Sequence, residues 1–327
     1  MESDLQITVK GKEECLARKI GEAVLEMVKV LDNRLDFRRM HQIIITPDFS
    51  KELKEQSART ASGNAIEYTD EEYAVAVAKV MLFRDNNEFE ILPIVNAQVA
   101  SMLVQQNEEG YSSDQFYMVL HLLHHELCHV HDDNKKIDAY SDMMLRYRCK
   151  GKDTYTFPLA EICWAEYIAN FLSCSTAKEI SITAMGESLS DAIVRTKNTI
   201  DSEIRNYRYH ADLNRLMNIF QRHGVFLVKT AAYMLGYIDG LERTLEKLYS
   251  EASLKLSGSY FEKTWNSMHI ALQEMRALYP SEWRDLSIYH NLIFVMENFY
   301  ADMGFLLSNT ADEETYINIP FRPENTP

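Results

Sequence analysis

Glycine, proline and cysteine are scarce in this chain. Of its 327 residues, 11 are glycine, 7 are proline and 5 are cysteine. Few glycines and prolines leave room for long uninterrupted helices, which favours a helix-rich fold. The cysteines are odd in number and contain no C-x-x-C pair, so neither a disulfide framework nor a cysteine-based zinc knuckle is indicated. Reduced thiols are typical of cytoplasmic proteins, and we therefore expect a cytoplasmic location.

Positive charge and long apolar runs are also scarce. The chain has 34 Lys and Arg against 49 Asp and Glu, a formal net charge of −15. Binding to nucleic acid requires clustered basic residues to neutralise phosphates, so we expect no nucleic-acid partner. The longest apolar run, residues 225–238, is interrupted by Lys229 and is too short to span a bilayer. The first residues are acidic where a signal peptide would be basic, and we expect no membrane association.

The N-terminal half mixes expected strands with helices. Residues 5–9 and 42–46 favour strands, and apolar spacing from Glu13 to Leu35 favours a helix of about six turns between them. Residues 73–83 and 89–95 are expected to form a hairpin. Pro93 cannot donate a hydrogen bond to a ladder, which favours an edge position for the second strand.

Helices are expected from about residue 113 onward, and the C-terminal half is expected to be almost entirely helical. A helix is expected to begin near Ser113, and Pro158 is well placed to open the next one. From about residue 185 to 307 the sequence favours helices, with breaks near Gly224, Gly258 and Pro280. We therefore predict an α+β, helix-rich fold. Its expected parts are a domain over residues 1–180, a helical domain or extension over 181–307, and an extended tail over 308–327.

One segment carries the metal-binding pattern H-E-x-x-H, at His125, Glu126 and His129. Helical residues four apart lie about 40° apart around the axis and one turn apart along it, so both imidazoles can reach one cation. Glu126 lies about 100° around the axis from His125, where it can hold a metal-bound water without displacing a ligand. Zinc lowers the pKa of such a water and a carboxylate can take its proton. The pattern predicts a zinc site with two histidine ligands and Glu126 as the general base.

A third protein ligand must come from elsewhere in the chain, because two imidazoles leave zinc under-coordinated. Glu166 is the favoured candidate, since it lies on the next predicted helix with small side chains beside it. Glu161 lies about 140° around that helix from Glu166, so only one of the two can face the metal. Asp132 and Asp133 are further alternatives.

His121 and a tyrosine-rich segment further along the chain are additional polar candidates. His121 continues the histidine series one turn earlier, but the ends of that series lie about 12 Å apart along the axis. We expect His121 to be a partly buried, hydrogen-bonded residue. A hydrolase also needs a donor for the oxyanion. Tyr207, Tyr209 and His210 are candidates, although a tyrosine cluster at helical spacing is more often plain packing.

The two motifs together resemble those of the gluzincin metallopeptidases, and most closely the ImmA/IrrE group of intracellular zinc endopeptidases. The resemblance rests on H-E-x-x-H followed by E-x-x-A-N at residues 166–170, and it covers residues 115–173. It implies a zincin-like N-terminal half, with a small sheet and an active-site helix, and a bound Zn²⁺. It also implies that His125, His129 and Glu166 are the ligands and that Glu126 is catalytic.

We therefore expect a zinc metallopeptidase that hydrolyses peptide bonds of an intracellular protein or peptide substrate. A peptide is expected to pair with an exposed strand such as residues 89–95. The alternative is a zinc-stabilised regulatory or protein-interaction protein without catalysis. The acid beside the ligands favours the enzyme, because a structural zinc site needs no free carboxylate and is usually closed by four protein ligands.

Overall fold

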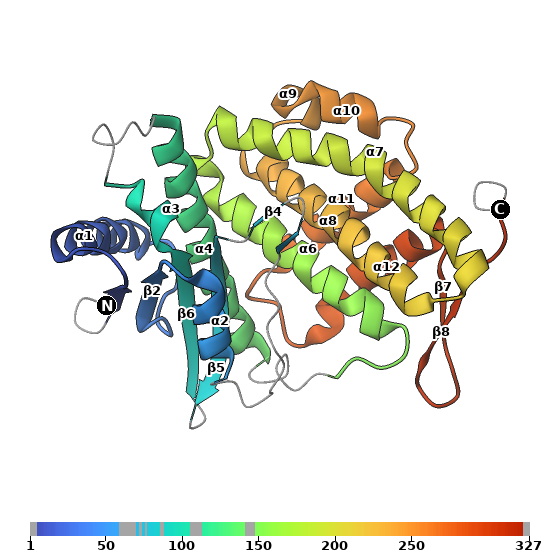
Figure 1. Cartoon of the computed structure of the whole chain (residues 1–327), viewed down its shortest axis with the longest axis horizontal. Helices are drawn as coiled ribbons and strands as arrows, with labels where there is room; N and C mark the ends of the chain where they lie inside the picture. The colour runs from blue at the N-terminus through green and yellow to red at the C-terminus, as the bar shows by residue number, and fades with distance from the viewer. Residues whose placement is uncertain are drawn as a thin grey trace. The chain divides into compact units, whose positions relative to one another are not determined.

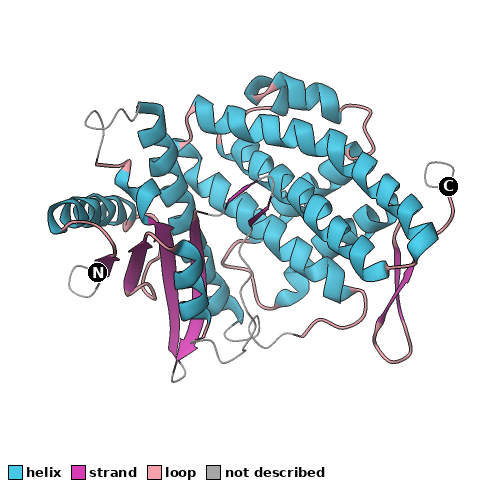
Figure 2. Ribbon diagram, in the orientation of Figure 1, coloured by secondary structure: helices cyan, strands magenta, loops and turns pink. Residues whose placement is uncertain are grey.

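The computed structural model describes residues 5–58, 70–71, 74–75, 77–85, 88–104, 113–140 and 148–322. The fold is α+β and helix-rich, as the sequence predicts (Figure 2). The chain divides into two compact units, Met1–Asp138 with Ser175–Ile180 and Ala139–Cys174 with Ser181–Pro327. In the part of the chain that the structure describes, every helix falls short of the length or apolarity that a bilayer crossing requires.

The first unit contains a four-stranded sheet with the strand order β1, β2, β6, β5 (Figure 1). β1 (Gln6–Val9) is parallel to β2 (Gln42–Thr46), and β2 is parallel to β6 (Glu88–Asn96). β5 (Ala78–Asp85) is antiparallel to β6, which confirms the predicted hairpin. The strand order places β1 and β5 at the two edges of the sheet.

The expectation that residues 89–95 form an edge strand is wrong, because β6 lies between β2 and β5. The N–H of Ile91 donates to the Arg39 carbonyl, and alternation along the strand turns the nitrogen of Pro93 to that same side. On that side the ladder with β2 begins only at Ile94. Proline is therefore tolerated in a central strand, just before the parallel pairing starts. A peptide is therefore not expected to pair with β6, because this strand already pairs with β2 on one side and with β5 on the other.

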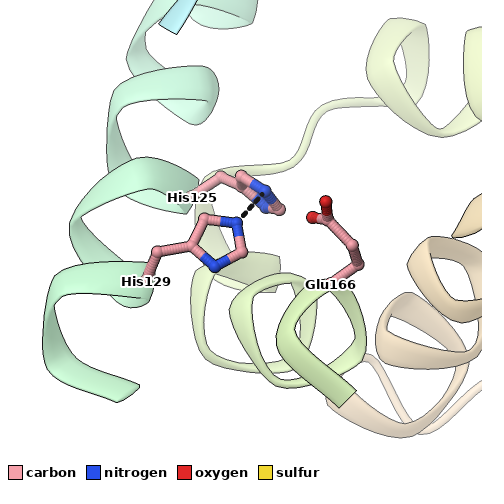
Figure 3. A group of neighbouring side chains, drawn as sticks. All are labelled: His125, His129 and Glu166. Carbon is pink, nitrogen blue, oxygen red and sulfur yellow. Dashed lines mark hydrogen bonds between the residues drawn. The ribbon is translucent and has the colours of Figure 1, made fainter. Parts of the chain in front are cut away.

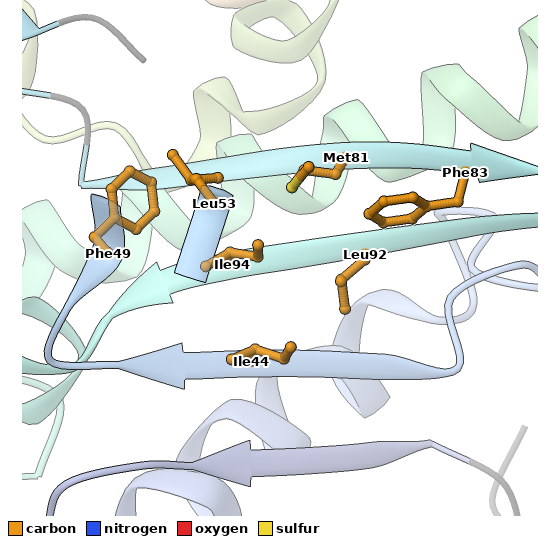
Figure 4. Close-up of a cluster of buried hydrophobic side chains, with 7 residues drawn as sticks. All are labelled: Ile44, Phe49, Leu53, Met81, Phe83, Leu92 and Ile94. Atoms are coloured by element: carbon orange, nitrogen blue, oxygen red, sulfur yellow. The ribbon is translucent and has the colours of Figure 1, made fainter. Parts of the chain in front are cut away.

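Apolar side chains gather on one face of the sheet (Figure 4). Strand residues two apart point to the same face, so β5 and β6 each contribute two side chains to it. Helix α2 (Phe49–Ser57) adds two more from its first turns. The members are Ile44, Phe49, Leu53, Met81, Phe83, Leu92 and Ile94.

Two helices and a small two-stranded ladder accompany the sheet in the first unit. Helix α1 (Glu14–Leu31) buries side chains at helical spacing but ends about one turn earlier than the predicted end at Leu35. Helix α3 (Ala97–Ser101) follows β6 directly, with Asn96 capping its first backbone N–H groups. Strands β3 (Asp70–Glu71) and β4 (Ala74–Val75) form a separate small ladder, so the expected strand over 73–83 joins the main sheet only from Ala78.

Helix α4 (Ser113–Tyr140) carries the H-E-x-x-H pattern and begins where the sequence predicts. The loop after α1 contacts the second half of α4 through ion pairs and hydrogen bonds. Lys135 Nζ lies 2.8 Å from Asp36 Oδ2, and Arg39 donates to Asn134 Oδ1 and Asp138 Oδ1 at 2.9 Å each. These contacts fix how α4 lies in the first unit.

The second unit is built around helices α6 (Asp153–Ser173) and α8 (Leu213–Gly240), which pack side by side (Figure 1). A Cβ atom added at Gly236 would lie 2.5 Å from the Tyr167 carbonyl oxygen, and one added at Gly240 would lie 2.8 Å from the Phe171 carbonyl oxygen. Glycine at these two positions therefore lets the backbones of the two helices approach closely.

Further helices surround this pair and complete the second unit. They are α7 (Glu179–His210), α9 (Leu245–Leu248), α10 (Ser250–Leu256), α11 (Glu262–Leu278), α12 (His290–Asp302) and the short 3₁₀ helix η2 (Leu286–Tyr289). The expected breaks near Gly258 and Pro280 are confirmed by the ends of α10 and α11.

Two expected helix boundaries are wrong. Gly224 lies inside α8, and the break falls instead at Ala211, whose φ is 55°, followed by Asp212, which caps α8. Pro158 does not open α6, which already begins at Asp153. Proline is tolerated near the start of the helix because only one intrahelical hydrogen bond is lost there.

The segment expected to be an extended tail contains a strand. β8 (Thr315–Asn318) pairs antiparallel with β7 (Leu306–Asn309). The hairpin contacts the start of α6, where Asn309 Oδ1 accepts the N–H of Lys152 at 2.8 Å and Gly151 donates to the Glu313 carbonyl at 2.6 Å. Gly151 has a φ of 53°, a backbone conformation that glycine adopts without strain.

Candidate metal site

Helix α4 brings the two histidines of the pattern together. The Nε2 atoms of His125 and His129 lie 2.9 Å apart, joined by the dashed line in Figure 3, and the ring planes are 88° apart. His125 is buried and His129 is half-buried. The i, i+4 spacing therefore has the effect that the sequence predicts, since both ring nitrogens converge on one point.

The distance between the two Nε2 atoms suits a shared zinc ion. Two nitrogens bound to a tetrahedral zinc at about 2.0–2.1 Å lie about 3.3 Å apart. The observed 2.9 Å requires an opening of only a few tenths of an ångström. Rotation about the side-chain bonds supplies such a shift, so the histidine pair fits the ion.

Glu166 is buried on α6, where its residue is 8% exposed. Its Oε1 lies 3.0 Å from Nζ of Lys229, which projects from α8. The Glu166 charge, together with Tyr233, raises the pKa of Lys229 above its usual value and outweighs the opposite effect of burial. The sequence does not predict this ion pair.

The possible ligand atoms of His125, His129 and Glu166 all lie within 4.8 Å of one another. Two imidazoles and one carboxylate are a ligand set that catalytic zinc uses, with the fourth position left to water or substrate. Glu161, Asp132 and Asp133 do not belong to this group. Of the alternatives for the third ligand, Glu166 is the member of this group.

Glu126 is buried on α4 and 9% exposed. Within the described ranges, its carboxylate forms neither a hydrogen bond nor an ion pair. It follows His125 in the chain and is not a member of the three-residue group. A buried carboxylate next to two histidines of this kind can accept a proton from a nearby water.

Two further histidines of α4 share one hydroxyl group. Nδ1 of His121 and Nδ1 of His124 lie 3.0 Å and 2.9 Å from Oγ1 of Thr176, in the 3₁₀ helix η1 (Cys174–Thr176). The hydroxyl has one proton, so it donates to one ring and accepts from the other. Burial, with smaller effects of His125 and Arg34, lowers the pKa of His124 to about 4. His121 is thus hydrogen-bonded and buried, as expected, and no local pattern indicates Thr176 as its partner.

The sequence alone marks Lys229 as unusual. It is the one charged residue that interrupts the apolar run over residues 225–238 before Asp239. Such a lysine must find a buried partner or reach solvent, and no local spacing identifies that partner. Only the packing of α6 on α8 places Glu166 opposite it.

The other candidates of the sequence lie elsewhere in the second unit. Tyr209 is 78% exposed at the end of α7, and the ring of Tyr207 pairs with that of His210 at 6.2 Å. A cavity of about 840 Å³ lies between α11 and α12, with Trp283 and Arg284 among its lining residues. None of the predicted site residues lines it.

Comparison of the chain with protein-family models, with curated proteins and with solved structures gives no match. The residues of the site and their geometry are therefore the only indications of function.

Proposed function

We propose that this protein is a zinc-dependent metallopeptidase with a zincin-like N-terminal half. His125, His129 and Glu166 bind Zn²⁺, and Glu126 is the general base. The observation that carries the proposal is the group of two imidazoles and one carboxylate within 4.8 Å, together with a second carboxylate, Glu126, on the same helix as the histidines. Among the described residues, the oxygens of Glu126 have no partner. Three ligands and a separate acid are the composition of an open catalytic site, whereas structural sites usually have four protein ligands.

The chemistry divides between the ion and the chain. Bound zinc would lower the pKa of a water molecule and polarise a carbonyl group. Glu126 accepts the proton of the attacking water and returns it to the leaving amine. The low exposure of Glu126 keeps competing solvent away from its carboxylate. The proposed substrate is a protein or peptide in the cytoplasm.

The test is a comparison of Glu126→Gln with the wild-type protein. Both are reconstituted with zinc, and cleavage of a quenched-fluorescent peptide library is measured together with bound metal. We expect the variant to keep its zinc and to lose about 10²–10⁴-fold in rate, the usual contribution of a general base. Glu161→Gln is the matched control, because Glu161 is an acid outside the metal group, and it keeps both properties.

Undiminished cleavage by Glu126→Gln would refute the assigned base. Zinc binding without cleavage by the wild type, followed by unfolding on chelation, would favour a zinc-stabilised regulatory or interaction protein instead.

A further inference from the structure

The N-cap position of α6 is occupied by a residue that cannot cap the helix. This residue is Lys152, and a lysine side chain has only hydrogen-bond donors, so it cannot accept an N–H of the first turn. The N–H groups of residues 153–155 are bound within a tight turn, by the carbonyls of residues 150–152 at 3.0–3.2 Å. Such a turn leaves the N–H groups of Gly151 and Lys152 to find acceptors elsewhere in the chain.

The β7–β8 hairpin supplies those acceptors (Figure 1). Asn309 Oδ1 accepts the N–H of Lys152 at 2.8 Å. The Glu313 carbonyl accepts the N–H of Gly151 at 2.6 Å. Thr315 Oγ1 donates to the Gly151 carbonyl at 2.5 Å. Asn309 thus does what an asparagine at the N-cap position usually does, although it lies 157 positions away from Lys152 in the chain.

Two ion pairs accompany these hydrogen bonds. Lys152 Nζ lies 2.6 Å from Glu297 Oε2 on α12, and Lys150 pairs with Glu313 of the hairpin. The side chains of both pairs are exposed or partly exposed. Exposed ion pairs contribute little by themselves, so they support the cap rather than form it.

Packing takes over from the cap a few residues further into α6. Thr156 and Phe157 are buried in the core of the second unit. Pro158 has no N–H to donate to the Thr154 carbonyl, which weakens the hydrogen-bond ladder between the first turn and the rest of the helix. Residues 150–154 therefore depend on the hairpin, whereas the core holds the helix from Thr156 onward.

We propose that the β7–β8 hairpin is a latch that caps α6 from a distant part of the chain. While the latch is closed, residues 150–154 stay folded at the start of the helix. When it is released, these residues unfold and lengthen the connection between α4 and α6. A segment far away in the chain thus sets the length of this connection. The inference is independent of the proposed metal site.

Hydrogen–deuterium exchange of the full-length chain tests the latch, with Asn309→Ala as the variant. We expect the N–H groups of Gly151 and Lys152 to exchange about three- to thirtyfold faster, the effect of removing a capping side chain on local opening. Amides beyond Phe157 keep the wild-type rate. Asn309→Asp retains an acceptor oxygen and keeps the slow exchange at both positions.

Two further variants complete the test. Thr315→Val removes the other side-chain hydrogen bond of the latch, and we expect faster exchange at the same two amides. Asn291→Ala is the matched control, because Asn291 donates to Glu274 at 2.9 Å in the same unit, and its loss leaves the exchange of residues 150–154 unchanged. The amides of β7 and β8 show in each variant whether the hairpin itself is still paired.

Each other outcome overturns the proposal. Unchanged exchange at Gly151 and Lys152 in Asn309→Ala, with the hairpin still paired, would refute the latch. An equal rise throughout α6 would also refute it, because the hairpin would then stabilise the whole unit rather than the first turn. If Asn309→Ala loses the hairpin, Thr315→Val decides, and unchanged exchange at the two amides there would refute the latch as well.

Discussion

Helices α4 and α6 carry the proposed metal ligands, and they are held in their own units by different forces. α4 is held by charge, through the contacts of Lys135 and Asp138 with the loop after α1, and it contains a buried ion pair between Asp132 and Lys136. α6 is held by shape, through glycines of α8 and an aromatic cluster around Trp164. A helix held by charge is sensitive to the loss of one partner, whereas a helix held by shape is sensitive to added volume.

The buried pair in α4 gives the largest expected effect. The side chains of Asp132 and Lys136 are 1% and 6% exposed, and their charged atoms lie 2.9 Å apart. Asp132→Ala removes one member of a buried ion pair, and a change of this kind costs about 3–5 kcal/mol. Urea unfolding of the metal-free protein measures the loss.

The control for this change is Asp191→Ala. Asp191 pairs with Arg195 at the same i, i+4 spacing, but the two side chains are 65% and 57% exposed. Exposed pairs of this kind contribute at most about 1 kcal/mol. Equal, small losses in both variants would show that burial of the Asp132–Lys136 pair adds nothing to its contribution to stability.

Added volume tests the second helix. A Cβ at Gly236 would lie 2.5 Å from the Tyr167 carbonyl oxygen and 2.8 Å from Cβ of Asn170. Gly236→Ala therefore forces α6 and α8 apart, and we expect a loss of about 1–3 kcal/mol in the free energy of unfolding. Because Glu166 lies on α6, zinc affinity falls as well.

Gly21→Ala is the control for that change, since a Cβ there meets its nearest neighbour at 3.9 Å, an ordinary contact. In the middle of α1 it is expected to stabilise the protein by about 0.5–1 kcal/mol. A Gly236→Ala variant as stable as the wild type would contradict the close approach of α6 and α8.

The smallest expected effect is the pH dependence of the contact between Asp36 and Lys135 of α4. Burial alone would raise the pKa of Asp36, but hydrogen bonds from Lys135 and the Arg38 backbone, with their charges, lower it below the usual value. The folded pKa is thus below the unfolded pKa, so the stabilisation is complete above about pH 3.9 and is lost as pH falls through the folded pKa.

Asp36→Asn removes this dependence. At pH 7 the variant loses about 0.5–1 kcal/mol, because the group is partly exposed and screened. Below pH 4 the difference between the two proteins shrinks. Denaturant titrations at pH 7 and in steps below pH 4 measure it, and a constant difference would be inconsistent with the lowered pKa.

The sequence predicts what depends on local spacing. The histidine pair of α4 follows from i, i+4 geometry, and the β5–β6 hairpin follows from two short runs around a turn. Glu166 is proposed as a ligand only with the help of a motif, since no local spacing relates it to the histidines. Lys229 is not found, because its partner is 63 positions away in the chain (229 − 166).

The errors have the same origin. Pro93 favours an edge strand on local grounds, but the strand order that makes β6 central is set by residues far away, in β2. Gly224 favours a helix break on local grounds, but the helix continues through it because α8 is held by its neighbours. Tertiary contacts overrode a local preference in both places.

The most direct measurement is the zinc content of the wild type and of the His125→Ala/His129→Ala double variant, by elemental analysis after reconstitution and dialysis. We expect about one zinc ion per wild-type chain and none in the double variant, with Glu126→Gln equal to the wild type. A wild-type chain that stays without zinc after reconstitution, or a double variant that keeps it, would contradict the metal site at residues 125, 129 and 166.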